Sequence, residues 1–353
     1  MKKFLAILMA AVMLLAVVSV GVAEEPTYAK SSEYDASGDA PFTLYFTSVS
    51  VTGDSHTTAM YAFKEAVEAL SGGSLTCNVY ADGTGSSSEG ELDDLKTGSM
   101  MGGMDIAYLS FPTLSTQAGL EWMAMVNSGY FWANYDHMTN TLNNSEIGDQ
   151  IFAEIQEKTG LVPMCAMYLG SRCINTRAKE INSYADMAGV MLRMPGSEAW
   201  QNLGRALGAE PTSIAFSELY TALEQGTVDG EENPIANFYS YQFQEVQKYI
   251  TMSNHIYSPF LFDMSKKIWD TYDADTQAIL SEAAKAFGEE EKAINRKAAA
   301  ENLQSCIDDY GIEVTYLTDD AKAEFLAKTA HIQDMIAKDT GAEIMDLLKA
   351  AKG

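Results

Sequence analysis

The longest helix-forming stretch of the chain limits its architecture most strongly. Residues 273–310 read DADTQAILSEAAKAFGEEEKAINRKAAAENLQSCIDDY, a nearly continuous run of helix formers that only Gly288 interrupts. At about 1.5 Å per residue, a helix of roughly 36 residues extends about 54 Å, which exceeds the width of one small domain. The sequence therefore predicts two lobes that share one long helix.

Strands and helices alternate before this helix in the order typical of βαβ units. In the first half, the expected strands are FTLYFTSV (42–49), SLTCNVYA (74–81) and MDIAYLSF (104–111). One helix is expected over 57–70, and a second begins at an S-x-x-E capping box at Ser88 and ends at Gly98. This alternation predicts the α/β class, with a mostly parallel mixed sheet flanked by helices.

The same pattern begins again in the second half of the chain. The expected strands are LVPMCAMYLG (161–170), SRCINT (171–176) and VMLRMP (190–195). A helix is expected from Ser197 to about Gly208, and another from its cap at Ser217 to Gly226. Two α/β lobes that share a helix predict a clamshell that binds a ligand at the carboxyl ends of its strands.

The N-terminal residues predict export. Lys2 and Lys3 precede an apolar run over 4–20, and the small residues Gly21, Val22 and Ala23 follow it. This is the pattern of a secretory signal peptide over 1–23, and the apolar core is too short for a retained membrane anchor. Residues 24–40 are polar and aperiodic, which indicates a flexible lead-in. We expect an exported protein of the periplasm or of an extracytoplasmic cell-wall space.

Charge excludes one class of partner and singles out one residue type. The formal net charge is −26, so nucleic acid is not an expected partner, because phosphate binding needs a basic face. The chain has only five arginines, and four of them lie within 172–205. They either pair with local carboxylates or grip a small carboxylate ligand through the forked guanidinium. Composition alone does not decide between these interpretations.

Motifs for catalysis or metal binding are absent from the sequence. It contains no G-x-S-x-G, G-x-G-x-x-G, P-loop or H-E-x-x-H motif, and its four histidines are isolated, so we expect neither an enzyme nor a metal or cofactor site. The cysteines Cys77, Cys165, Cys173 and Cys306 allow three pairings. A bridge between Cys165 and Cys173 and a set of four buried thiols both remain open.

One long segment resembles a known family. Residues 181–234 read INSYADMAGVMLRMPGSEAWQNLGRALGAEPTSIAFSELYTALEQGTVDGEENP, and FQEVQKYITMSNH follows at 243–255. This order of motifs resembles the DctP-type solute-binding proteins of TRAP transporters, with weaker agreement over 42–111 and 269–287. The resemblance implies a two-lobed, ligand-closing protein that captures a small organic acid and delivers it to the membrane subunits of a sodium-driven transporter.

The resemblance also implies roles for particular residues. Arg193 takes the position of the arginine that forks onto the ligand carboxylate, and Arg172 that of a second, more variable arginine. Asn233 matches the asparagine of the E-N-P motif, which offers amide hydrogen bonds to the acid. Phe216 matches an aromatic residue beside the ligand, although it could be a core residue. Glu89 fits an acidic position that reaches ligand hydroxyls, although it could instead serve the start of a helix.

The expected organisation and the open questions follow from these points. We expect the first lobe over 41–169 and 259–298, the second over 170–258 and 299–353, and a monomer. SMMGGMD (99–105) adds about four residues relative to the family pattern, and the sequence does not state their role. The ligand class is also open among C4-dicarboxylates, sugar acids, 2-oxo acids and aromatic acids. A binding protein for an ATP-driven importer or a sensor system is the alternative function, and a secreted hydrolase is a more distant one.

Overall fold

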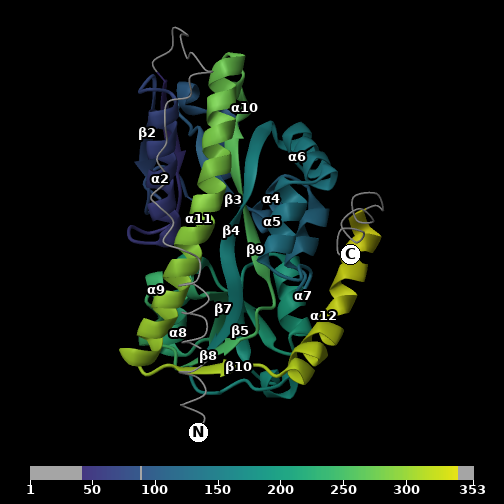
Figure 1. Cartoon of the computed structure of the whole chain (residues 1–353). Helices are drawn as coiled ribbons and strands as arrows, with labels where there is room; N and C mark the ends of the chain where they lie inside the picture. Colours follow the sequence, from purple (N-terminus) through teal and green to yellow (C-terminus); the bar gives the residue numbers. More distant parts are fainter. Residues whose placement is uncertain (1–41, 88–89, 341–353) are drawn as a thin grey trace. The chain divides into compact units, whose positions relative to one another are not determined.

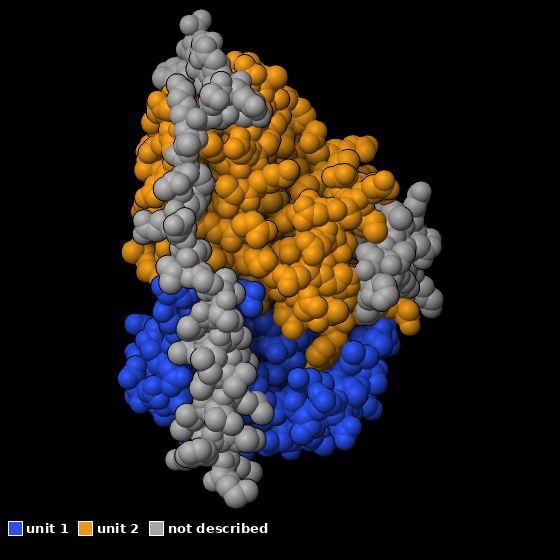
Figure 2. Space-filling view, viewed as in Figure 1, with its two compact units in different colours: residues 1–27, 170–256, 295–332 blue, residues 28–169, 257–294, 333–353 orange. Residues whose placement is uncertain are grey.

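The chain folds into two compact units, each with its own core. The computed structural model describes residues 42–87 and 90–340. Unit 1 comprises Gly170–Ile256 and Asn295–Ile332; unit 2 comprises the described residues up to Leu169, Tyr257–Ile294 and the described residues from Gln333 (Figure 2). The predicted signal peptide, the lead-in and Glu89 lie outside the described residues.

Unit 2 begins with the predicted βαβ units (Figure 1). Strand β1 pairs in parallel with β2 and β3, and β3 pairs with β9 in the antiparallel direction. Its elements are β1 (Phe42–Thr47), α2 (Ser55–Leu70), β2 (Leu75–Tyr80), α3 (Glu91–Thr97), the 3₁₀ turn η1 (Ser99–Met101), β3 (Ile106–Ser110), α4 (Phe111–Gln117), η2 (Glu121–Asn127), α5 (Tyr135–Asn143), α6 (Glu146–Thr159), β9 (Tyr257–Ser265) and α10 (Lys266–Trp269).

Unit 1 contains a second group of paired strands. Strand β5 pairs in parallel with β6 and β7, β4 is antiparallel to β7 and β8, and β8 is parallel to β10. Its elements are η3 (Tyr184–Met187), β5 (Met191–Met194), α7 (Glu198–Ala206), β6 (Glu210–Ser213), η4 (Phe216–Glu218), α8 (Leu219–Gln225), β7 (Gly230–Pro234), α9 (Ile235–Ser240), η5 (Phe243–Glu245), β8 (Tyr249–Met252) and β10 (Glu313–Tyr316). The predicted α/β class with a mostly parallel sheet is confirmed.

Three elements contain residues of both units. They are β4 (Leu161–Thr176), α11 (Ala274–Asp308) and α12 (Asp319–Thr340). The 35-residue α11 confirms the predicted long helix. Its residues up to Ile294 belong to unit 2, and those from Asn295 belong to unit 1.

Two local predictions were wrong. The segments 161–170 and 171–176 were expected as two strands, but they form the single strand β4, with Gly170 at φ +138° inside it. Gly170 does not end the strand, because glycine can adopt this φ without steric cost. Ser217 was expected to cap a helix, but it lies within η4, and α8 begins only at Leu219, after Glu218, which makes no side-chain cap.

Helix ends elsewhere follow the expected chemistry. The Asp54 side chain caps α2 by accepting from the backbone N–H of His56, so this helix begins two residues before the predicted start. Helices α3 and α8 end at Gly98 and Gly226, as predicted, and Gly226 adopts the left-handed conformation with φ +72°. The predicted cap Ser88 lies outside the described residues.

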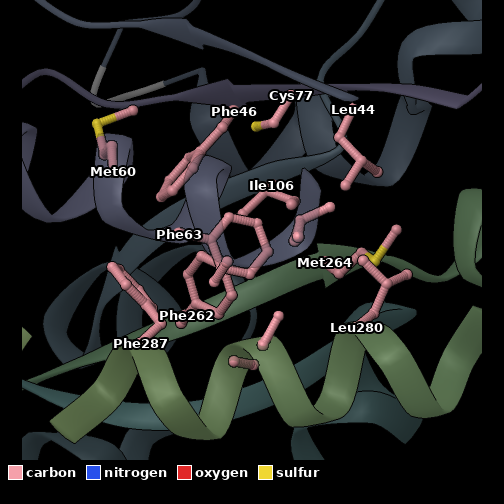
Figure 3. Close-up of a cluster of buried hydrophobic side chains, with 14 of the residues drawn as sticks. Leu44, Phe46, Met60, Phe63, Cys77, Ile106, Phe262, Met264, Leu280 and Phe287 are labelled. Carbon is pink, nitrogen blue, oxygen red and sulfur yellow. The ribbon is translucent and has the colours of Figure 1, made fainter. Parts of the chain in front are cut away.

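Aromatic side chains form the centre of the unit 2 core (Figure 3). Phe63 of α2 lies edge-on to Phe262 of β9 with ring centroids 4.8 Å apart, and Phe287 of α11 lies 4.9 Å from Phe262. Burial of each such side chain stabilises the fold by about 1.5–3 kcal/mol. The first half of α11 is thereby fixed to the sheet of unit 2.

The four cysteines are free thiols, and all four are buried. A Cys165–Cys173 bridge, one of the two alternatives from the sequence, is therefore absent in this structure. Burial raises the pKa of Cys173 to about 12, and that of Cys306 likewise, so both thiols stay protonated and packed in the unit 1 core. Over residues 42–87 and 90–340, no helix combines the length and apolarity needed to cross a bilayer.

Candidate ligand-binding site

Arg193 is the central group of the site, and strand β5 fixes its position. Its backbone pairs with Thr212 of β6, and its side chain is only 4% exposed. The guanidinium Nε donates to the carbonyl of Ile214 at 2.9 Å, and its central carbon lies 5.5 Å from the Phe216 ring centroid. No carboxylate of the described residues comes within 4.0 Å of its nitrogens. Arg193 therefore presents a buried positive charge without an ion-pair partner in the described chain.

The charge balance around Arg193 explains its pKa. Burial lowers the pKa of Arg193 from 12.5 to about 10, and the nearby Glu231 and Glu232 act against this decrease. The side chain still carries its full charge at neutral pH. Because a buried cation is costly without a counter-charge, an anion that binds here is stabilised strongly.

Arg172 differs from Arg193, although it is also buried. Its Nε donates to a carboxylate oxygen of Glu232 at 2.5 Å, and its Nη2 donates to the other oxygen at 2.8 Å. The same Nη2 also donates to the Asn233 side-chain oxygen at 2.9 Å, and the guanidinium carbon lies 4.8 Å from the Trp200 ring centroid. Only Nη1 makes no hydrogen bond with a described residue, so Arg172 is largely occupied by the protein itself.

Glu232 is held as a carboxylate from two sides. His255 contacts it through Nε2 at 3.1 Å, and the other ring nitrogen of His255 lies 2.8 Å from the Ser253 hydroxyl. Burial acts to raise the pKa of Glu232, but the Arg172 guanidinium and the His255 hydrogen bond hold it below the ordinary value. Both oxygens of Glu232 are therefore occupied by the protein's own cationic and imidazole groups.

Glu231 lies on the opposite face of β7 and has the opposite pKa shift. It stands across from Asn175 of β4, whose amide donates to it at 2.6 Å, and the Asn233 amide donates to its second oxygen. Burial is the main cause that raises the pKa of Glu231 to about 7, and the Glu232 charge adds to it. The two hydrogen bonds act in the other direction but do not overcome burial.

Four of the five predicted site residues meet in unit 1, on or beside adjacent strands. Arg193 contacts Phe216, while Arg172 contacts Asn233. Phe216 is 36% exposed and packs edge-on against Tyr241 at 4.7 Å, so it is a partly open aromatic rather than a core residue. The amide of Asn233 is bonded at both ends, to Arg172 and Glu231. Glu89 lies outside the described residues.

Sequence reasoning missed two side chains that support the site. Trp200 of α7 packs against Arg172, and His255 fixes Glu232. The N-H pair at 254–255 was visible in the sequence, but its contact with a strand more than 20 residues earlier was not. Over the described residues, no group of three or more His, Cys, Asp or Glu side chains is arranged to hold a metal ion.

A small carboxylate fits the unpaired donors of the buried Arg193 guanidinium. Residues 46–339 match the family described as bacterial extracellular solute-binding protein, family 7. The chain belongs to this family, which is the DctP family.

Relatives and solved structures resemble most of the chain. A solute-binding protein of Roseobacter denitrificans is 30% identical over 69% of this chain and 72% of its own, and the C4-dicarboxylate-binding periplasmic protein DctP of Rhodobacter capsulatus is 26% identical over 82% and 84%. The sugar acid binding protein of Advenella mimigardefordensis, in complex with galactonate, superposes with a TM-score of 0.80 at 25% identity, covering 88% of this chain and 98% of that one. A TRAP periplasmic solute-binding protein of Sulfurospirillum deleyianum with bound succinate superposes with a TM-score of 0.77 at 26% identity, covering 88% of this chain and 99% of that one.

Proposed function

We propose that this protein captures a small organic acid outside the cytoplasm and delivers it to the membrane subunits of a TRAP transporter. The observation that carries the proposal is the buried Arg193, which no described carboxylate neutralises. A ligand carboxylate that accepts two hydrogen bonds from its free Nη atoms would supply the missing counter-charge. The relatives with bound galactonate and succinate support an organic acid as the ligand.

The surrounding residues have distinct roles in this proposal. Phe216 lies against the Arg193 guanidinium and limits the directions in which it can turn. Arg172 contributes its remaining Nη1 donor and, through Asn233, fixes the end of β7. Asn233 acts mainly by holding Arg172 and Glu231, and only one of its amide protons is left for a ligand.

The wider assignment is part of the same proposal. The chain acts as a monomer that is exported by the signal at 1–23, and it performs no chemistry on its ligand. A binding protein of an ATP-driven importer or of a sensor system is the competing function. The DctP family match favours the TRAP transporter.

The test is calorimetric titration of mature, ligand-stripped protein with a panel of organic acids, beside the variants Arg193→Ala and Arg205→Ala. Arg205 is the matched control, because it is exposed on α7 and bonds only to Asn202 among the described residues. We expect one acid to bind wild type and Arg205→Ala equally and to lose at least about 100-fold in affinity with Arg193→Ala, since a buried charge pair loses its partner. Equal binding by Arg193→Ala would overturn the role of Arg193, and binding of no acid would overturn the function.

A further inference from the structure

A histidine lies completely buried between two acidic side chains in unit 2. His56, Asp54 and Glu291 are each 0% exposed. The Asp54 Oδ1 atom lies 2.7 Å from the ring Nδ1 of His56, and a Glu291 oxygen lies 3.7 Å from its Nε2. Asp54 caps α2, and Glu291 belongs to α11. The two ring nitrogens therefore face carboxyl groups from two different elements.

The hydrogen bonds of this cluster favour a charged ring. Asp54 Oδ1 accepts the backbone N–H of His56 at 2.7 Å, so this oxygen acts as an acceptor toward the ring Nδ1 as well. Glu291 Oε2 accepts the backbone N–H of Tyr168 at 3.2 Å. Carboxylates on both sides of an imidazole favour its doubly protonated, positively charged form. That charge offsets the cost of holding carboxylates in the protein interior.

The other groups packed around the ring are uncharged at neutral pH. The rings of Tyr108 on β3 and Phe260 on β9 lie 6.3 and 6.0 Å from the His56 ring, between centroids. Burial raises the pKa of Tyr108 well above 10. Burial also raises the pKa of Cys165 on β4 and of Tyr135 on α5. None of these side chains supplies a charge that competes with the two carboxylates.

The two carboxylates outweigh the effect of burial on His56. Burial acts to lower the pKa of His56, but the charge and hydrogen bond of Asp54, followed by the charge of Glu291, raise it above 6.5. The helix dipole opposes a positive charge in the first turn of α2, and the Asp54 cap counters this repulsion as well. His56 therefore keeps its charge to a higher pH than an exposed histidine does.

The cluster contacts two of the elements through which unit 2 continues into unit 1. Tyr168 lies on β4 immediately before Leu169, the last residue of that strand in unit 2. Glu291 lies on α11 just before Ile294, the last residue of that helix in unit 2. The His56 cluster is thus placed where it fixes both elements to the start of α2 before they leave the unit.

We infer that His56, Asp54 and Glu291 form a pH-sensitive tie that holds the start of α2 against β4 and α11. When the imidazolium releases its proton to solvent, the two carboxylates face a neutral ring and the tie loosens. Because the folded pKa is raised, the stabilisation is complete below pH 6.5 and is lost as the pH rises through the folded pKa. The inference does not depend on the proposed function, since its residues all belong to unit 2 and lie outside the candidate site.

The first experiment is an NMR titration of the His56 ring in isotope-labelled mature protein from about pH 5 to pH 10, with its signal assigned through His56→Gln. We expect a midpoint above 6.5 in wild type. In Glu291→Gln, we expect the midpoint to fall by about one unit or more, because one of two opposite charges is removed. A wild-type midpoint at or below 6.5 overturns the inference, and so does a midpoint that Glu291→Gln leaves unchanged.

The second experiment measures hydrogen exchange by mass spectrometry between about pH 6 and pH 9, with rates corrected for their intrinsic pH dependence. In peptides from the start of α2 and from α11 before Ile294, wild type should lose at least about tenfold in protection as the pH rises, whereas His56→Gln should be weakly protected throughout. His331→Gln is the matched control, because His331 is exposed on α12 and contacts the backbone of its own helix.

His331→Gln should follow wild type at every pH. Protection that does not change with pH in wild type, or that changes equally in wild type and His56→Gln, overturns the inference. If His56→Gln does not fold, as judged by its thermal unfolding, the comparison of wild type with Glu291→Gln decides in both experiments.

Discussion

Replacement of Glu231 by Gln should remove part of the pH dependence of the protein's stability. The glutamate is 0% exposed on β7, and burial raises its pKa from 4.5 to about 7. In the unfolded chain it returns to the ordinary value. Between these two pKa values the folded state therefore binds more protons than the unfolded state, and the free energy of unfolding falls as the pH rises.

The size of this effect follows from the two pKa values. Each pKa unit corresponds to about 1.4 kcal/mol, so the Glu231 contribution to stability falls by roughly 3 kcal/mol between about pH 4.5 and pH 7 and is then constant. Glutamine cannot ionise and fits the same space. The Asn175 side-chain oxygen is buried without a hydrogen-bond partner in the described structure. If the Asn175 amide flips, this oxygen can accept a hydrogen bond from the new glutamine amide.

The assay is urea unfolding of wild type and Glu231→Gln at intervals from pH 4.5 to pH 8. We expect the free energy of unfolding of the variant, relative to that of wild type, to rise by about 3 kcal/mol between pH 4.5 and pH 8. Glu232→Gln is the matched comparison, because its pKa is lowered in the folded state. That substitution should cost a nearly constant amount of stability from pH 4.5 to pH 8, because the contribution of Glu232 is lost only as the pH falls below 4.5 through its lower folded pKa. A Glu231→Gln difference that does not change with pH would refute the reasoning.

Three further predictions concern other parts of the chain. Neither oxygen of the buried Asp263 accepts a hydrogen bond from the described residues, and burial raises the pKa of Asp263 to about 8. Asp263→Asn should therefore raise the melting temperature at pH 8, and this gain should disappear near pH 4. Gly170→Ala places a Cβ 2.4 Å from Pro234, whereas a Cβ at Gly189 meets nothing within 4 Å. In urea unfolding, Gly189→Ala should lower the free energy of unfolding by roughly 1 kcal/mol, and Gly170→Ala should lower it clearly more. Met100 and Met101 are 75% and 76% exposed, so dilute peroxide should oxidise them before the buried methionines, as peptide mass spectrometry would show, without loss of folded protein.

The elements that sequence predicted best are those set by local patterns. Helix α11 was visible because 35 consecutive residues form a helix with few interruptions, and Gly226 marked the end of α8 because only a left-handed residue fits there. The single strand β4 was not predictable, because Gly170 ordinarily signals a break. Strand β4 continues through Gly170 because this residue has no side chain, so the backbone can pass close to Pro234.

The candidate site also combines features that follow from local sequence with features that depend on distant strand pairing. The alternation of side chains along a strand places the adjacent Glu231 and Glu232 on opposite faces of β7. Which one meets Arg172 depends on the register of β7 against β4, whose paired residues lie about 60 positions apart. No local signal specifies that register, so neither the Arg172–Glu232 pair nor the protonation of Glu231 near neutral pH could be derived beforehand.

The acidic composition of the chain makes the lack of a described ion pair at Arg193 more informative than the position of Arg193 in its motif. Acidic residues outnumber lysine and arginine by 49 to 23, so a buried arginine in this chain would ordinarily find a carboxylate. Arg172 does so, and Arg193, one strand away from Glu231 and Glu232, does not within the described structure. The two glutamates are instead occupied by Arg172, His255, Asn175 and Asn233, which hold their oxygens in fixed hydrogen bonds. The network thus keeps the local carboxylates away from Arg193, and a carboxylate supplied from solution is the group that fits its remaining donors.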